Sequence, residues 1–87
     1  MKAFNTNFGP TLAIGKVGEN RTTVLIAGDD AEAKQTLAQA ITAGNTIDAI
    51  DAGPLARARE LEALAYLQIG LAVSENVGWT GGFAVVR

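Results

Sequence analysis

A corner between a strand and a helix holds the residues of this sequence best placed to meet a ligand. Residues 51–55 are Asp-Ala-Gly-Pro-Leu, and a charged stretch follows at residues 57–62. A Gly-Pro pair ends an apolar strand, because glycine allows close backbone approach and proline fits the first turn of a helix. In open α/β sheets, ligands bind in crevices at the carboxyl ends of strands. The pattern indicates either a ligand-facing corner or a plain strand-to-helix connection, and spacing alone favours the second.

The residue types exclude several kinds of chemistry. The chain has no histidine and no cysteine, which excludes a histidine-containing triad, a histidine or thiolate metal site and a disulfide within it. Carboxylate, lysine or tyrosine chemistry remains, as does chemistry performed by a bound cofactor. Hydride transfer between two cofactors fits the last class, because the protein then only aligns donor and acceptor and excludes water. We interpret the other charged candidates as caps and helix-surface pairs, because no catalytic spacing joins them; they are Lys2, Asp51, Glu60 and Glu62.

Composition places the chain among small globular domains. It has 87 residues, of which 48% are hydrophobic and 18% charged, and its formal net charge is −2. We therefore expect a single small α/β domain over residues 1–87 that buries about 60% of its unfolded surface. The lack of a basic cluster argues against binding to nucleic acid or an anionic membrane. No stretch is typical of a membrane span or a secretory signal, so a cytoplasmic location is expected.

The predicted architecture is a small sheet with a parallel strand-helix-strand unit and a long C-terminal helix. Residues 22–27 and 47–52 predict two apolar strands. Because such crossover units join parallel strands, we expect these two to be parallel. The helix between them is expected to start at Asp29 with a capping box completed by Glu32, and to carry Lys34 on a polar face. The two adjacent acids at its start could also hold a metal or a ribose, but the helix dipole favours capping.

The two ends of the chain are less regular in sequence. Residues 1–5 are expected to form a short strand that belongs to a larger sheet. Residues 5–21 indicate a loop with one helical turn after Pro10, and a polar loop of this length is more often functional than idle. The C-terminal tail predicts a Gly-Gly turn and a short strand. Its aromatic residues, Trp79 and Phe83, are expected to anchor packing rather than to stack on a ligand.

The last predicted helix changes character along its length. It is expected over residues 54–76, with charges in its first turns and none over residues 64–73. A helix that is apolar all round is buried on more than one side. We therefore expect this stretch to contact a second copy of the chain, with a purely internal core as the alternative.

Three ordered motifs resemble the C-terminal half of the NADPH-dependent deazaflavin (coenzyme F-420) reductases, a family of NADP oxidoreductases. The motifs are KAFNT at residues 2–6, TVLIAGDDAEAK at 23–34 and DAGPL with ARELE at 51–62, and together they span nearly the whole chain. Family members carry an N-terminal Rossmann nucleotide-binding half with a glycine-rich turn, and they move hydride between NADP(H) and the deazaflavin. The resemblance implies NADP and a deazaflavin as cofactors, and a place for this chain in a larger Rossmann-like sheet.

The resemblance also implies which residues surround the cofactors. The loop after the first strand would supply one wall of the place where nicotinamide and deazaflavin meet, and the Gly-Pro-Leu corner would supply the second. The residues implied are Asn5, Thr6, Asn7 and the Gly9 backbone for the first wall, and Leu55 for the second. Amide, hydroxyl and backbone groups can hydrogen-bond to a ring edge, and a leucine can press on a ring face. Asn7 departs from the expected pattern, because an apolar residue would pack better against a ring.

The glycine-rich turn of the family is not found in these 87 residues. Neither a Gly-x-Gly-x-x-Gly nor a Walker motif occurs, so the phosphate-binding loop is missing. The expected function is that of the C-terminal segment of a hydride-transferring oxidoreductase, inactive alone, which supplies the deazaflavin side and an oligomer contact. The alternative is a non-catalytic oligomerisation or ligand-binding module derived from the family. The sequence would then come from a truncated or split reading frame, or from a stand-alone relic of the family. The expected partner is a second copy of the chain, in a homo-oligomer, or a separate nucleotide-binding domain.

Overall fold

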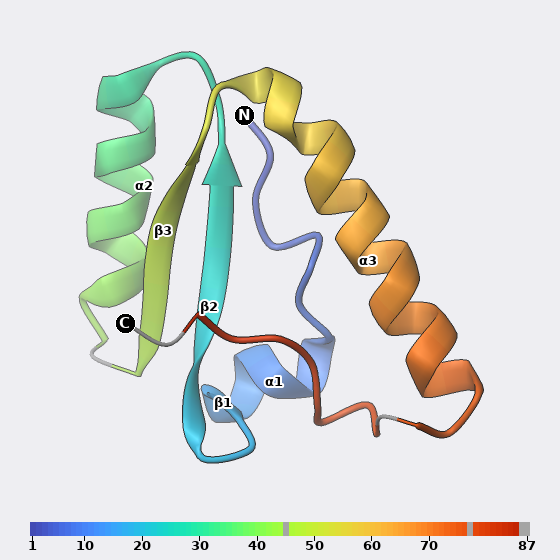
Figure 1. The fold of residues 1–87 in the computed structure, drawn as a ribbon. Helices are drawn as coiled ribbons and strands as arrows, with labels where there is room; N and C mark the ends of the chain where they lie inside the picture. Colours follow the sequence, from blue (N-terminus) through green and yellow to red (C-terminus); the bar gives the residue numbers. More distant parts are fainter. Residues whose placement is uncertain (45, 77, 86–87) are drawn as a thin grey trace.

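The computed structural model describes residues 1–44, 46–76 and 78–85 as a small α/β domain with a three-stranded mixed sheet (Figure 1). The sheet order is β1-β2-β3. In chain order the elements are α1 (Gly9–Ile14), β1 (Lys16–Val17), β2 (Asn20–Ala27), α2 (Ala31–Thr42), β3 (Ile47–Gly53), the 3-10 turn η1 (Leu55–Arg57) and α3 (Ala58–Val73).

The β2-α2-β3 unit forms the predicted parallel crossover. β2 pairs with β3 in parallel, from Thr22 opposite Ile47 to Ala27 opposite Gly53. Figure 1 shows α2 beside β3 and α3 on the other side of β2. Most β-branched and apolar side chains of β2 are buried, as their composition predicts; Val24, Ile26 and Ala27 have no exposed surface, and Leu25 is half-buried. Strand β2 therefore contributes three of the five buried hydrophobic residues found in the described part of the chain.

The stretch predicted as a loop over residues 5–21 contains more structure than expected. The helical turn after Pro10 is confirmed as α1, which ends at Gly15, a residue with a left-handed φ of 73°. The antiparallel pairing of β1 with β2 was missed, because a two-residue strand carries too little hydrophobic pattern to be recognised. The turn between them uses Gly18, whose φ of 60° favours glycine.

An N-terminal segment, which we define as residues 1–8, lies along β2 (Figure 1). Its backbone pairs with β2 at one residue, where Lys2 and Ala27 exchange two hydrogen bonds of 2.7 and 2.9 Å. Further along, Asn7 Nδ2 donates to the Thr23 carbonyl at 2.8 Å. The short strand predicted over residues 1–5 is therefore reduced to an isolated antiparallel bridge.

Helix α3 is fastened to the other side of the N-terminal segment. Gln68 Nε2 donates a hydrogen bond of 2.8 Å to the Thr6 carbonyl. Gln68 is only 3% exposed, and Leu61 and Ala72 are buried on the same helix face. Gly82 of the tail lies against the same side chain, since a Cβ atom added there would lie 2.9 Å from Gln68 Oε1. The N-terminal segment thus lies between β2 and α3 and is hydrogen-bonded to both.

Both ends of the long helix differ from the expectation over residues 54–76. Its first turn is the 3-10 turn η1, and α3 ends at Val73. Glu75 then adopts a left-handed φ of 64°, which interrupts a right-handed helix. Over the described part of the tail, residues 78–85, the predicted strand does not form. Among the described residues, no helix has the length and apolar character needed to cross a bilayer.

The start of α2 is also capped differently from the prediction. The N-cap is Asp30, whose Oδ1 accepts a hydrogen bond of 3.0 Å from the Ala33 amide. Asp29 instead accepts a hydrogen bond of 3.0 Å from the Leu55 amide. The predicted capping box of Asp29 and Glu32 is therefore wrong, because the Asp29 carboxylate accepts a hydrogen bond from the Leu55 amide, which follows β3.

We predict that Gln68→Leu destabilises the domain, because it leaves the Thr6 carbonyl without its partner. The expected loss in free energy of unfolding is about 1–3 kcal/mol, measured from the midpoint of urea denaturation. Gln39→Leu on the exposed face of α2 serves as the matched control and should stay within about 0.5 kcal/mol of wild type. Equal midpoints for Gln68→Leu and wild type would contradict the role given to this bond.

Candidate functional site

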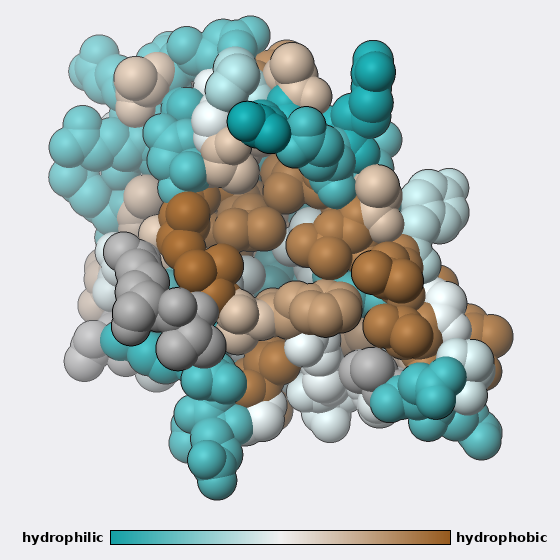
Figure 2. Space-filling view, viewed as in Figure 1, coloured by the Kyte–Doolittle hydropathy of each residue, from teal (hydrophilic) through white to brown (hydrophobic). Residues whose placement is uncertain are grey.

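A cavity of about 370 Å³ lies between the N-terminal segment, α1 and α3. Its lining brings together four of the five residues implied by the family resemblance. Figure 2 shows hydrophobic residues gathered over the middle of the face drawn, between the sheet and α3. The lining residues are Asn5, Thr6, Asn7, Phe8, Gly9, Pro10, Ala65, Ile69 and Trp79.

Two residues that line the cavity, Asn5 and Asn7, also carry buried polar atoms that lack a partner. Within residues 1–44, 46–76 and 78–85, nothing hydrogen-bonds to Asn5 Nδ2, Asn5 Oδ1 or Asn7 Oδ1, although all three are shielded from solvent. A buried polar atom without a hydrogen bond costs about 1–3 kcal/mol. Such groups are rare in folded proteins and call for a specific reason. Because these atoms have almost no accessible surface, a ligand in the cavity would bond to them only after the two side chains turned towards it.

The remaining walls of the cavity are largely apolar. The rings of Phe8 and Trp79 contact each other with a centroid separation of 4.9 Å and an interplanar angle of 59°. Ala65 and Ile69, one helical turn apart, face the cavity from α3. An apolar hollow with a few polar groups is the usual composition of a small-molecule site. The arrangement suits a flat heterocycle whose edge is polar.

Leu55, the fifth implied residue, lies elsewhere in the domain. Among the described residues, those that line the cavity do not include it. It starts η1 just after β3, its side chain is 42% exposed, and its amide donates to Asp29. The structure therefore brings the first predicted wall together as a cavity and leaves the second as an exposed corner.

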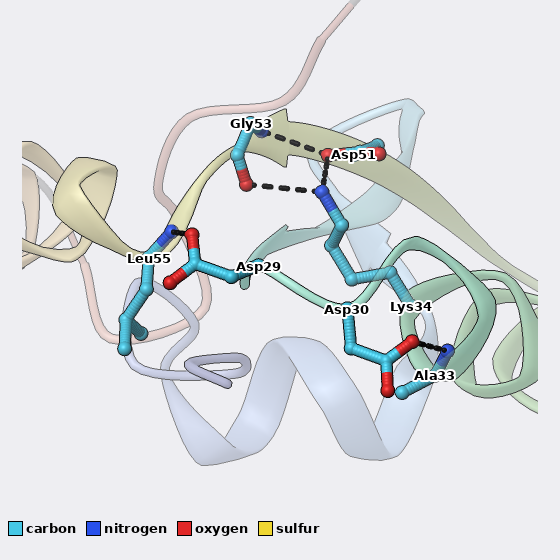
Figure 3. Close-up of polar contacts among 7 residues, drawn as sticks. All are labelled: Asp29, Asp30, Ala33, Lys34, Asp51, Gly53 and Leu55. Atoms are coloured by element: carbon cyan, nitrogen blue, oxygen red, sulfur yellow. Dashed lines mark hydrogen bonds and ion pairs between the residues drawn. The ribbon is translucent and has the colours of Figure 1, made fainter.

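A network of polar contacts holds that corner in shape (Figure 3). Lys34 Nζ reaches from α2 to Asp51 Oδ1 at 2.9 Å and to the Gly53 carbonyl at 3.2 Å. Asp51 Oδ1 also accepts from the Gly53 amide at 2.8 Å. Gly53 has a φ of 110°, which favours glycine. The network fixes the backbone just before the Gly-Pro turn.

Lys34 was missed as a member of this corner. The sequence pattern assigns it to a polar helix face, yet the residue is only 8% exposed. Its aliphatic stem is buried, while its ammonium group reaches the Asp51 carboxylate on β3. A lysine on the first turn of a crossover helix, together with an acid at the end of the following strand, is the signal that could have identified the pair.

The electrostatics of the corner favour a permanent carboxylate at Asp51. The hydrogen bond from Lys34, followed by that from the Gly53 amide, lowers the pKa of Asp51 below its ordinary value of 3.8. A carboxylate in this state accepts hydrogen bonds and does not serve as a proton donor near neutral pH. The described residues hold no group of three or more acids able to bind a metal.

We predict that Asp51 contributes to stability in a pH-dependent way. Because its pKa is lower in the folded state, the contribution is complete above the ordinary value of 3.8 and is lost as the pH falls through the folded value. The Asp51→Asn variant should be less stable than wild type at neutral pH, since it leaves the buried Lys34 ammonium without its counterion. Its free energy of unfolding should also change less between about pH 5 and about pH 2.

The measurement is a series of urea denaturations across this pH range. The control is Glu32→Gln, which changes an exposed acid in the first turn of α2, the helix that carries Lys34. This variant should keep the wild-type acid dependence. Identical pH profiles for Asp51→Asn and wild type would refute the assigned coupling.

The comparison with known proteins gives no family assignment. No protein-family model matches the chain, and a search of the curated proteins finds no match to it. The family resemblance therefore stays a prediction from the motifs. The cavity and its unpartnered amides are the features on which a function can be argued.

Proposed function

We propose that this domain supplies the deazaflavin-side wall of a hydride-transferring oxidoreductase. The observation that carries the proposal is the pair of asparagines, Asn5 and Asn7, whose shielded amide atoms lack partners among the described residues and which line one mostly apolar cavity. The motifs that resemble the NADP oxidoreductases point to the same residues. The cavity itself does not depend on the family resemblance.

The residues of the cavity fit a deazaflavin ring. The pyrimidine edge of such a ring alternates carbonyl acceptors with an N–H donor, and the Asn5 amide offers one donor and one acceptor. Asn7 Oδ1 adds an acceptor, while its Nδ2 is held by the Thr23 carbonyl. Phe8, Trp79 and Ile69 offer apolar surface for the ring faces. Asn7, which departs from the apolar pattern expected from the resemblance, is thereby given a role at the ring edge.

The contribution of this chain would be binding and orientation. A bound deazaflavin supplies the carbon that exchanges hydride with NADP(H). The asparagine amides fix the rotation of the ring in its plane, and the apolar walls exclude water from it. The NADP(H) side of the site would come from a nucleotide-binding domain outside these 87 residues. A role for Leu55 on that second side stays a prediction.

We predict that Asn5→Ala separates binding from stability. The affinity for the deazaflavin coenzyme should fall about ten-fold, equivalent to about 1.4 kcal/mol. The free energy of unfolding should stay unchanged or rise, because the lost amide has no partner within the described part of the chain. Binding can be followed by fluorescence, since Trp79 is the only tryptophan and lines the cavity.

The matched control is Asn20→Ala, which removes an exposed asparagine at the start of β2 and should bind as wild type does. A wild-type chain that shows no saturable quenching by the coenzyme would overturn the proposed function. A large loss of stability in Asn5→Ala would instead give Asn5 a structural role.

The outer side of α3 supports a second candidate, a non-catalytic oligomerisation module. Tyr66, Leu67 and Val73 are 78%, 55% and 70% exposed, and residues 64–73 carry no charge. An exposed apolar stripe without charge suits contact with an identical stripe, because a two-fold axis then brings no like charges together. We propose that this stripe joins two copies of the chain, whether or not the cavity binds a coenzyme.

We predict that Leu67→Glu prevents this association. The buried glutamates of two copies would face each other without counterions, so the variant should sediment as a monomer at concentrations where wild type sediments as a dimer. Gln35→Glu on the exposed side of α2 adds the same charge and should sediment as wild type. A wild-type monomer would refute the contact, and a dimer without coenzyme binding would favour the non-catalytic module.

A further inference from the structure

The side of α3 that faces away from the domain has a spacing that reads the same from either end. Helix α3 lies at the edge of the molecule (Figure 1), and its buried residues face inward. The exposed residues on the opposite side follow one another at intervals of four, three, one, three and four, which places them on one helix face. We call them the outward face of α3; they are Arg59, Ala63, Tyr66, Leu67, Gly70 and Ser74.

This spacing suits two copies of the helix that pack antiparallel about a two-fold axis. Such an axis makes every contact occur twice, because residue i meets residue j and residue j meets residue i. With the axis between Tyr66 and Leu67, these two large side chains face each other across the contact. Ala63 then lies opposite Gly70 of the second copy. In parallel packing, each residue would instead meet its own copy.

Gly70 is a residue that the domain itself does not require. It lies inside α3, where glycine is less favourable than alanine because it orders a more flexible backbone. Over the described part of the chain, nothing lies within 4 Å of the position that a Cβ atom would take at Gly70. The distance between two packed helices depends on the side chains at their contact, and small residues allow the closest approach. A second helix that presents Ala63 at this point would make use of the glycine.

The charges at the two ends of the outward face complement each other in the antiparallel arrangement only. Residues 63–74 carry no charge, Arg59 precedes them and Glu75 follows them. The ion pairs among the described residues include neither of these two side chains. The last turn of α3 also has no basic residue, although a helix C-terminus favours a cation. Antiparallel packing brings Arg59 to that end of the second copy, whereas parallel packing would bring Arg59 to Arg59.

We infer that two copies of the chain associate through the outward faces of α3, packed antiparallel, with Gly70 of each copy against Ala63 of the other. This inference rests on the oligomerisation module proposed above and deepens it, because it fixes the orientation and the register of the contact. Tyr66 and Leu67, which are 78% and 55% exposed, are buried against each other at the axis. Arg59 of each copy meets the C-terminal end of the other helix.

Cysteine pairing tests the orientation, because the chain has no cysteine of its own. Ala63→Cys and Gly70→Cys chains are mixed under reducing conditions and then oxidised, and the cross-linked dimer is measured on a denaturing gel. A disulfide needs Cα atoms about 4.4–6.8 Å apart, so we expect the mixture to cross-link about five-fold faster than either variant alone. Gln35→Cys, on an exposed position of α2, replaces Ala63→Cys in the control mixture and should not show this gain.

A charge exchange tests the same register without adding a side chain at Gly70. Arg59→Glu should raise the dissociation constant of the dimer about ten-fold in sedimentation equilibrium, because it places like charges at both ends of the contact. Adding Glu75→Arg to this variant should return the constant to within about two-fold of wild type, since the pair is then reversed rather than lost. Lys16→Glu, which makes the same charge change on β1, is the matched control and should sediment as wild type.

The outcomes separate this inference from the module on which it rests. A wild-type monomer overturns both. A wild-type dimer in which Gly70→Cys cross-links to itself faster than to Ala63→Cys overturns the antiparallel register and leaves the module standing. A dimer that shows neither cross-link and is unaffected by Arg59→Glu uses another surface, which also overturns the inference. If Gly70→Cys itself blocks association, the charge exchange decides alone, since a failure of Glu75→Arg to restore the dimer contradicts the register.

Discussion

The candidate site depends on one hydrogen bond, from the Gln68 side chain to the Thr6 carbonyl, which joins residues 62 positions apart in the chain. Ala65 and Ile69 lie within a turn of Gln68 on α3, and both line the cavity. Thr6 lies between the two asparagines whose shielded amide atoms lack partners in the described part of the chain. The bond therefore links α3 to the N-terminal segment beside the cavity. Because it is buried, water does not compete for the carbonyl.

The domain divides its polar groups between two tasks. At the end of β3, Lys34, Asp51 and Gly53 satisfy one another, which fixes a corner and leaves little chemistry to perform. Near α3, Asn5 and Asn7 are shielded with three atoms unpaired over the described residues. Satisfied networks stabilise a fold, whereas unsatisfied buried groups destabilise it until a partner arrives. The polar atoms without partners therefore lie in the N-terminal segment, and not at the Gly-Pro corner, where the sequence motif is strongest.

Local sequence pattern was enough to predict the β2-α2-β3 unit of the domain. The β-branched run in β2, the apolar β3 and the helix between them lead directly to a parallel crossover, because few other arrangements bury those side chains. The family resemblance, and not local pattern, grouped four residues of the N-terminal loop; they line one cavity because neighbours in a short loop face the same space. Local pattern could not assign the cap of α2 to Asp30 over Asp29, because the choice depends on the Leu55 amide, which belongs to a distant turn. The same limit applies to the burial of Lys34.

The sequence by itself determined the crossover unit, the absence of histidine and cysteine chemistry, and the polar residue types of the N-terminal segment. Only the tertiary structure decided that α3 lies across the N-terminal segment, that Lys2 and Glu62 form an ion pair, and that Leu55 lies apart from Asn5. The physical reason is that strand and helix formation follow periodicities within a few residues, whereas the cavity and this ion pair are made by contacts between segments about sixty residues apart. Such contacts depend on how complete elements pack, and no local pattern encodes them.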